Sequence, residues 1–199
     1  VLTISAKNFE APSCGASNNA NTCLVTLSVT DGANTDTLAV TVTITDVNEA
    51  SPVFTDGETV AVNVAEAATA VGTYTATDAD TANTMTYSIV ASGNDHADFA
   101  INSASGVLTI SAKNFEAPSC GASNDANTCL VTLSVTDGST ADTLAVTVTI
   151  TDVNEANVVA PSDSDIAANT MAENVANDAT VGLTAVATDA DGTTNVISY

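Results

Sequence analysis

Acidic side chains dominate the chemistry that this sequence can perform. The chain has 24 Asp and Glu residues against 2 Lys, no Arg and 1 His, and its formal net charge is −22. Many of the acids lie in short motifs with a second acid or an amide, such as Asp46-Val-Asn48-Glu49 and Asp78-Ala-Asp80. Carboxylate and amide oxygens are ligands that hard divalent cations prefer. Divalent cations are therefore expected counter-ions, whereas nucleic acids and anionic membranes, which attract Lys and Arg, are not expected partners.

Catalytic motifs are missing from the sequence. There is no G-x-S-x-G, no HExxH and no glycine-rich phosphate loop. One His and no Arg leave few groups for acid–base or oxyanion chemistry. His96 lies in a polar loop sequence and is expected to be a solvated loop residue. We therefore expect a protein that is not an enzyme.

The hydrophobic fraction is 45%, made mostly of Val, Ala, Leu and Ile, with only 4% aromatic residues. This composition suits β-strands and argues against simple disorder. No run approaches the roughly 20 apolar residues that span a bilayer. No signal-like leader stands at Val1, so any export signal is expected upstream. The chain has no Asn-X-Ser/Thr sequon, which favours a bacterial source.

A long internal repeat organises the chain. The segment that starts at Val1 recurs at Val107, 106 residues later, and only four positions differ between residues 1–50 and 107–156. A repeat of this length is one domain rather than a solenoid unit. We expect residues 1–50 to be the last half of one repeat, 51–156 a complete repeat and 157–199 the first half of another. The chain then reads as a window on a longer array.

Seven short alternating segments in the complete repeat are expected to be strands. Turn residues such as Asp56-Gly57 and Asp137-Gly138 separate them. Seven strands in about 100 residues, without helical periodicity, predict an all-β fold of tandem Greek-key sandwiches. The expected strands are 59–64, 71–77, 84–90, 99–102, 107–111, 129–136 and 143–151.

An ordered series of motifs in the complete repeat resembles the cadherin repeat, of the type found in large bacterial surface proteins. The series is Val64-Ala65-Glu66, Ala76-Thr77-Asp78-Ala79-Asp80, Thr86-Tyr87-Ser88-Ile89, Phe99-Ala100-Ile101, Ser105-Gly106-Val107-Leu108, Asn114-Phe115-Glu116, Leu133-Ser134-Val135-Thr136-Asp137-Gly138 and Asp152-Val153-Asn154-Glu155. The resemblance extends over the whole chain and implies calcium ions at each joint between repeats.

The resemblance also implies which residues hold the ions. At the first joint they are Asn8, Glu10, Asp46, the Val47 carbonyl, Asn48, Glu49, Asp78, Asp80 and Asp137. At the second joint they are Glu66, Asn114, Glu116, Asp152, the Val153 carbonyl, Asn154, Glu155, Asp189 and Asp191. The family usually has Asp where Asn8 and Asn114 stand, and Asp-Asn in place of Glu49-Ala50 and Glu155-Ala156. Two or three ions per joint are expected.

Calcium takes about 6–8 oxygen ligands, which suits so many acids at one joint. Without cations the carboxylates repel one another, whereas bound cations link two domains. We therefore expect a rod that is stiff with calcium and flexible without it. The alternative for each acid taken singly is a solvated turn residue, and this is the expectation for Asp56, which matches no ligand position.

Four cysteines repeat with the same spacing. Cys14 and Cys23 have eight residues between them, and Cys120 and Cys129 repeat the pair. One local disulfide per repeat, Cys14–Cys23 and Cys120–Cys129, is the expectation, and it implies an oxidising compartment. A zinc site is the alternative, but His96 is the only nitrogen donor for it. Lys7 and Lys113 are expected to be surface lysines near carboxylates, the alternative being contacts with a neighbouring chain.

These features predict a calcium-rigidified structural or adhesive segment of an extracellular or cell-surface protein. One alternative is a homophilic cell-adhesion module, although the chain lacks the tryptophan that strand-swapping adhesion uses. The other is a self-assembling filament subunit, in which the final half repeat of one chain is completed by the first half repeat of the next. A segment such as 88–106 would then be missing. Partners expected beyond calcium are neighbouring repeats and identical chains.

Overall fold

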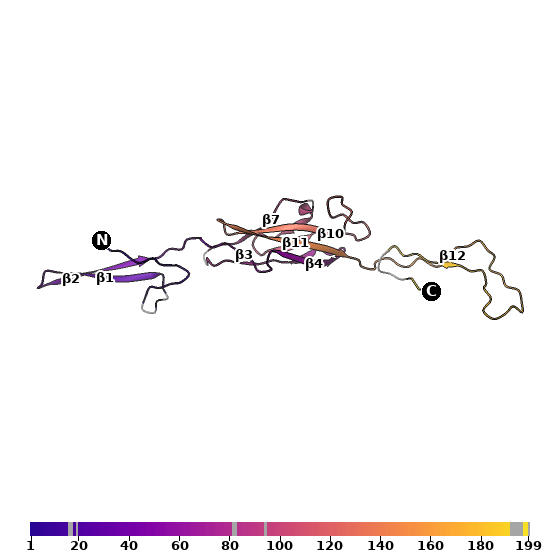
Figure 1. Ribbon diagram of the computed structural model, residues 1–199, viewed down its shortest axis with the longest axis horizontal. Helices are drawn as coiled ribbons and strands as arrows, with labels where there is room; N and C mark the ends of the chain where they lie inside the picture. The colour runs from indigo at the N-terminus through magenta and orange to yellow at the C-terminus, as the bar shows by residue number, and fades with distance from the viewer. Residues whose placement is uncertain (16–17, 19, 81–82, 94, 192–196, 199) are drawn as a thin grey trace.

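A computed structural model describes residues 1–15, 18, 20–80, 83–93, 95–191 and 197–198. The molecule is elongated, with a β-hairpin at one end, a β-sandwich in the middle and an extended segment at the other end (Figure 1). The described residues form strands and one short 3₁₀ turn, η1 (His96–Asp98), without any α-helix. Within this described part no helix has the length and hydrophobicity needed to cross a lipid bilayer.

The larger sheet of the sandwich has four strands in the order β4 (Thr59–Ala65), β11 (Ala141–Thr151), β10 (Thr128–Thr136) and β7 (Thr86–Ile89). β10 pairs antiparallel with β11 and with β7, whereas β4 joins β11 in parallel. Val131, Leu133 and Val135 in β10 are buried at 3%, 0% and 0% exposure. Because alternate residues of a strand face the same side, these three cover one face of the sheet.

The second layer combines two small antiparallel sheets. One has the order β5 (Ala70–Thr73), β9 (Val107–Ile110) and β8 (Phe99–Ile101), and the other pairs β3 (Val53–Phe54) with β6 (Ala76–Thr77). Side chains from both layers form one hydrophobic core, which includes Phe54, Tyr74, Leu108, Ile110, Leu133, Leu144 and Ile150. The expected all-β sandwich is confirmed.

All seven expected strands are present, with two differences in detail. The strand expected over 71–77 divides into β5 and β6, because it changes partner: the Tyr74 N–H still donates to the Gly106 carbonyl beside β9 at 3.0 Å, whereas β6 pairs with β3. The sequence analysis also missed β3. Its two residues pair with β6, after which Gly57 (φ +84°) lets the chain cross to β4 in the other layer.

The hairpin at the N-terminal end consists of β1 (Thr22–Thr30) and β2 (Thr35–Thr43). It has the same register as β10 and β11, since Leu27 lies opposite Leu38 just as Leu133 lies opposite Leu144. At the other end the described strands of 157–199 are β12 (Ser162–Asp163) and β13 (Ala185–Val186), which pair antiparallel.

Both expected disulfides are present. Cys14 is bonded to Cys23 and Cys120 to Cys129, with Cα–Cα distances of 4.8 and 4.9 Å. Cys120 and Cys129 are almost fully buried. Each bridge closes a loop that a short backbone bridge also ties together, between Cys14 and Ala20 and between Cys120 and Ala126.

Candidate metal centre

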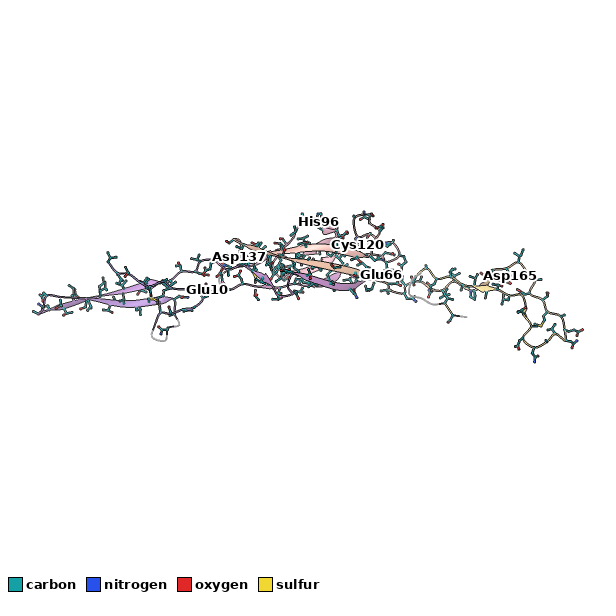
Figure 2. The ribbon with its side chains drawn as sticks, viewed as in Figure 1. Glu10, Glu66, His96, Cys120, Asp137 and Asp165 are labelled. Atoms are coloured by element: carbon teal, nitrogen blue, oxygen red, sulfur yellow. A yellow bond between two sulfur atoms is a disulfide. The ribbon has the colours of Figure 1, made fainter. Side chains whose placement is uncertain are left out.

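Three carboxylates from separate parts of the chain meet at the first joint. Glu10 precedes the hairpin, Asp46 follows it, and Asp80 lies after β6 in the sandwich. One oxygen of each of these residues lies within 4.8 Å of the others, and we call this group the first-joint cluster. Figure 2 labels Glu10 and Asp137 at the end of the sandwich that faces the hairpin.

The hydrogen bonds of the Asp78-Ala-Asp80 motif tie the linker to the sandwich. Asp80 is 3% exposed, and its Oδ2 accepts the backbone N–H groups of Glu49 and Ala50 at 3.0 and 2.7 Å. Its own N–H donates to Oδ1 of Asp78 at 2.9 Å. These bonds bring residues about 30 positions apart into one site.

Several buried oxygens at the first joint accept no hydrogen bond. They are Oε1 of Glu10, Oδ1 of Asp46 and Oδ2 of Asp78. Buried carboxylate oxygens without a donor are costly. A cation held by the first-joint cluster would interact with the carboxylates of Glu10 and Asp46.

Asp137 lies at the same end of the sandwich, in the turn after β10. Its Oδ1 accepts the N–H groups of Ser139 and Thr140, both at 2.7 Å. The Thr140 and Ser139 bonds lower the pKa of Asp137 from its ordinary value, and the Asn48 side chain lowers it further. Asp137 is therefore ionised at neutral pH and is linked to Asn48 in the linker.

The second-joint cluster repeats the arrangement at the other end of the sandwich, where Figure 2 labels Glu66. One oxygen each of Glu66, Glu116 and Asp152 lies within 4.8 Å of the others. Glu66 is 7% exposed. Its Oε2 accepts the N–H of Phe115 at 2.9 Å and its Oε1 that of Val153 at 2.8 Å. Glu66 thereby holds the Glu116 segment and the linker together.

Asp189 and Asp191, which follow the second linker, make hydrogen bonds of the same kind at the second joint as Asp78 and Asp80 make at the first. Oδ2 of Asp191 accepts the N–H of Ala156 at 2.7 Å, and the N–H of Asp191 donates to Oδ1 of Asp189 at 3.1 Å. Asp191 is 3% exposed. The described groups within the 4.8 Å limit do not include Asp189, Asp191 or Glu155.

Repulsion among these acids raises several pKa values. Desolvation raises the pKa of Glu155, and the charges of Glu66, Glu116 and Asp191 raise it further. The backbone N–H of Glu116 lowers the pKa of that carboxyl, but desolvation and neighbouring carboxylates outweigh it. The same balance, with Asp46 as the neighbour, raises the pKa of Glu10. Both joints therefore concentrate negative charge.

Two expected ligands, Asn8 and Asn114, also make local hydrogen bonds. Oδ1 of Asn8 accepts the N–H of Ala11 at 2.8 Å, and Oδ1 of Asn114 accepts that of Ala117 at 2.6 Å. Both side chains are exposed and serve local turns. Val47, Glu49, Val153 and Asn154 lie in the linkers, on surface that is largely exposed. The N–H of Glu49 donates to Asp80 of the first-joint cluster, and the Glu49 charge contributes to the raised pKa of Glu10.

The clusters have the donor chemistry of a hard divalent cation. Metal–oxygen distances of about 2.3–2.6 Å place opposed ligands roughly 5 Å apart, so oxygens within 4.8 Å of one another can share one ion. The donors are all oxygens, with no thiolate because the described cysteines are in disulfides. The residues therefore fit calcium better than zinc.

The sequence analysis missed two kinds of supporting residue. Nδ2 of Asn127 donates to the Phe115 carbonyl at 2.9 Å, and Asn21 donates to the Phe9 carbonyl at the same distance. Asp95 is 3% exposed and accepts the N–H groups of Gly121 and Leu130, so it anchors the second cysteine loop. Asn21 and Asn127 occupy the same position in the two copies of the repeat, and this could have identified them as supporting residues.

Lys113 and His96 have structural contacts. Nζ of Lys113 lies 2.8 Å from Oδ2 of Asp98, and it donates to Ser119 Oγ. Lys7 makes the corresponding bond to Ser13. Nδ1 of His96 lies 2.9 Å from the Gly93 carbonyl oxygen in the 3₁₀ turn. His96 is half-buried rather than fully solvated.

Comparisons with known proteins support the fold alone. A scan against protein-family models finds no match, and a search of curated proteins finds none either. Among solved structures, the chain is similar to extracellular cadherin domains 3–6 of protocadherin gamma B2, with a TM-score of 0.58 and 23% identity over 85% of this chain and 43% of that one. It is also similar to domains 22–24 of mouse cadherin-23, with a TM-score of 0.54 and 21% identity over 94% of this chain and 56% of that one.

A third neighbour is a structure of domains 3–6 of protocadherin gamma B7, with a TM-score of 0.58 and 23% identity. The match covers 95% of this chain and 45% of that one. The chain therefore spans between 43% and 56% of the length of these three neighbours. All three neighbours are cadherin or protocadherin domains. The chain therefore has the cadherin-like β-sandwich fold.

Proposed function

We propose that this chain is a calcium-rigidified segment of an extracellular surface protein, in which cadherin-like repeats are linked by ions at their joints. The proposal divides the chain into 1–50, 51–156 and 157–199. The observation that carries it is the first-joint cluster, whose members come from before, within and after the linker. A cation bound there would join the hairpin segment to the sandwich.

Three further features support calcium as the ion. The donors are carboxylates, the buried oxygens of Glu10, Asp46 and Asp78 accept no hydrogen bond, and the net charge is −22. Removal of the ion leaves like charges at about 5 Å or less, whose repulsion loosens the joint. The function is then a spacer whose stiffness depends on extracellular calcium.

The test is calcium titration of the 199-residue chain by calorimetry, with small-angle X-ray scattering in calcium and in chelator. We expect binding at both joints, a higher unfolding temperature with calcium and a longer maximum dimension. Asp46→Asn should weaken first-joint binding by about tenfold or more. Asp56→Asn is the matched control, because Asp56 is an exposed turn residue outside both clusters. Equal stability and equal dimensions with and without calcium would overturn the proposal.

A further inference from the structure

Two acids that lie outside both joint clusters share one short turn of the sandwich. Asp95 is the residue before η1, and Asp98 is the last residue of η1. Neither acid belongs to a cluster of the described residues. Asp95 is 3% exposed, and a buried carboxylate is costly unless donors compensate for its burial. The partners of the two acids therefore show what this turn does.

The Asp95 carboxylate holds both ends of the second cysteine loop. Its Oδ1 accepts the N–H of Gly121 and its Oδ2 that of Leu130, both at 2.8 Å. Gly121 directly follows Cys120, and Leu130 directly follows Cys129. Hydrogen bonds to a carboxylate are stronger than those between neutral groups. A residue from a different part of the chain therefore fixes the backbone beside both sulfurs of the disulfide.

Asp98 holds the chain that leads into the same loop. Its Oδ2 lies 2.8 Å from Nζ of Lys113, whose side chain is only 7% exposed. Its Oδ1 accepts the Ser111 hydroxyl at 3.1 Å, and its carbonyl accepts the Ser111 N–H at 2.7 Å. Nζ of Lys113 also donates to Oγ of Ser119, the residue before Cys120, at 3.2 Å. Lys113 therefore ties the turn to the start of the cysteine loop.

The segment that is held in this way carries a carboxylate of the second-joint cluster. Glu116 lies between Lys113 and the cysteine loop. The Lys113 carbonyl accepts the N–H of Ala67 at 2.9 Å, and the Phe115 N–H donates to Oε2 of Glu66 at 2.9 Å. Because these bonds link the segment to Glu66 and the residue after it, a shift of Lys113 changes how Glu116 faces Glu66.

We propose that Asp95 and Asp98 are positioning residues for the second joint, which hold the Glu116 segment in place for metal binding. Figure 2 shows His96, which belongs to the same turn, apart from Glu66 at the joint. The Glu116 side chain is exposed, so its backbone supplies most of the restraint on where the carboxylate lies. A ligand that is held in place before the ion arrives loses less conformational freedom on binding. The effect on calcium rests on the proposed function, whereas the restraint on the segment does not.

The test is calcium titration of the 199-residue chain, followed by nuclear magnetic resonance of its backbone amides. The amide of Glu116 reports the second joint and that of Glu10 the first. Asp95→Asn replaces one acceptor oxygen with an NH₂ group, and we expect it to weaken binding at the second joint by about tenfold and to leave the first joint unchanged. Asp125→Asn is the matched control, because Asp125 is exposed in the same cysteine loop and the other copy has Asn19 at this position. It should bind calcium like the parent chain.

Hydrogen exchange of the Phe115 amide in chelator measures the same restraint without any ion. We expect exchange to be severalfold faster in Asp95→Asn than in the parent chain and in Asp125→Asn. Asp98→Asn should change both measurements in the same direction but less, and it is the second variant because the Asp98 side chain is 33% exposed and its replacement disturbs folding less.

Three results would refute the inference. They are exchange at the parent rate in Asp95→Asn, equal loss of calcium affinity at both joints, and an Asp98→Asn chain that matches the parent in both measurements. A parent chain that binds no calcium at either joint would contradict the proposed function instead. The exchange rates in chelator would then decide by themselves whether the turn positions the Glu116 segment.

Discussion

Single amide side chains position the acids at the joints. Asn127 holds the backbone carbonyl between Asn114 and Glu116 through its Nδ2 donor, and Asn21 does the same for Phe9 beside Glu10. Both asparagines lie two residues before the second cysteine of their loop. The disulfide and the amide therefore act together on the segment that carries a cluster carboxylate.

Asn127→Ala should lower calcium affinity at the second joint by about tenfold, because residues that orient ligands typically have effects of this size. Asn21→Ala should have the same effect at the first joint. Calcium titration of both variants measures each effect. Comparison with the Asp46→Asn variant identifies which of the titrated sites belong to the first joint. Each asparagine variant serves as the control for the other. Equal loss at both joints in either variant would indicate general unfolding and contradict a local positioning role.

At the scale of the elements, burial decides how much each strand contributes to stability. Leu133 in β10 and Leu27 in β1 occupy the same place in the same sequence, but Leu133 is fully buried and Leu27 is 39% exposed. A buried leucine loses both its transfer free energy and its packing contacts when it is truncated. An exposed leucine loses much less of each.

Leu133→Ala should therefore lower the free energy of unfolding by about 2–5 kcal/mol. Leu27→Ala should change it by roughly 0.5 kcal/mol or less, as is usual for surface substitutions. Urea unfolding measures both. A comparable loss in the two variants would show that the hairpin is covered in the isolated chain.

At the scale of the whole molecule, pH changes the repulsion that separates the repeats. The pKa values of Glu10, Glu116 and Glu155 are raised above 4.5 in the folded chain. An acid with a raised pKa favours the folded state below its unfolded value, and this contribution is lost as pH rises through the folded pKa. Asp137 has a lowered pKa, so its contribution is present above 3.8 and is lost as pH falls through its folded pKa.

In chelator, the unfolding temperature should therefore rise as the pH is lowered from 7 to about 4.5, and fall again below about 3.8. In calcium the order should reverse between pH 7 and about 4.5, because protons compete with the cation for the same carboxylates. Scanning calorimetry across this range checks both trends. A chelated chain that is more stable at pH 7 than at about pH 4.5 would contradict the repulsion argument.

The sequence by itself determined the local structure and the composition of the joints. The alternating Val, Leu and Thr residues of 128–136 specify a strand with one apolar face, and the 106-residue repeat specifies where its copy lies. The sequence also determined the two disulfides, because the short spacing within each cysteine pair leaves a local bridge as the simplest arrangement. The expected calcium ligands, the bacterial source and the extracellular location stay predictions.

Only the tertiary structure decided which acids meet. It brought Asp80 to Glu10 and Asp46, and it showed that the Asn8 and Asn114 side chains accept backbone N–H groups in local turns. It also decided that Leu27 is exposed and Leu133 buried. The physical reason is that identical local sequences have identical conformational preferences, whereas burial and charge pairing depend on segments far away in the chain.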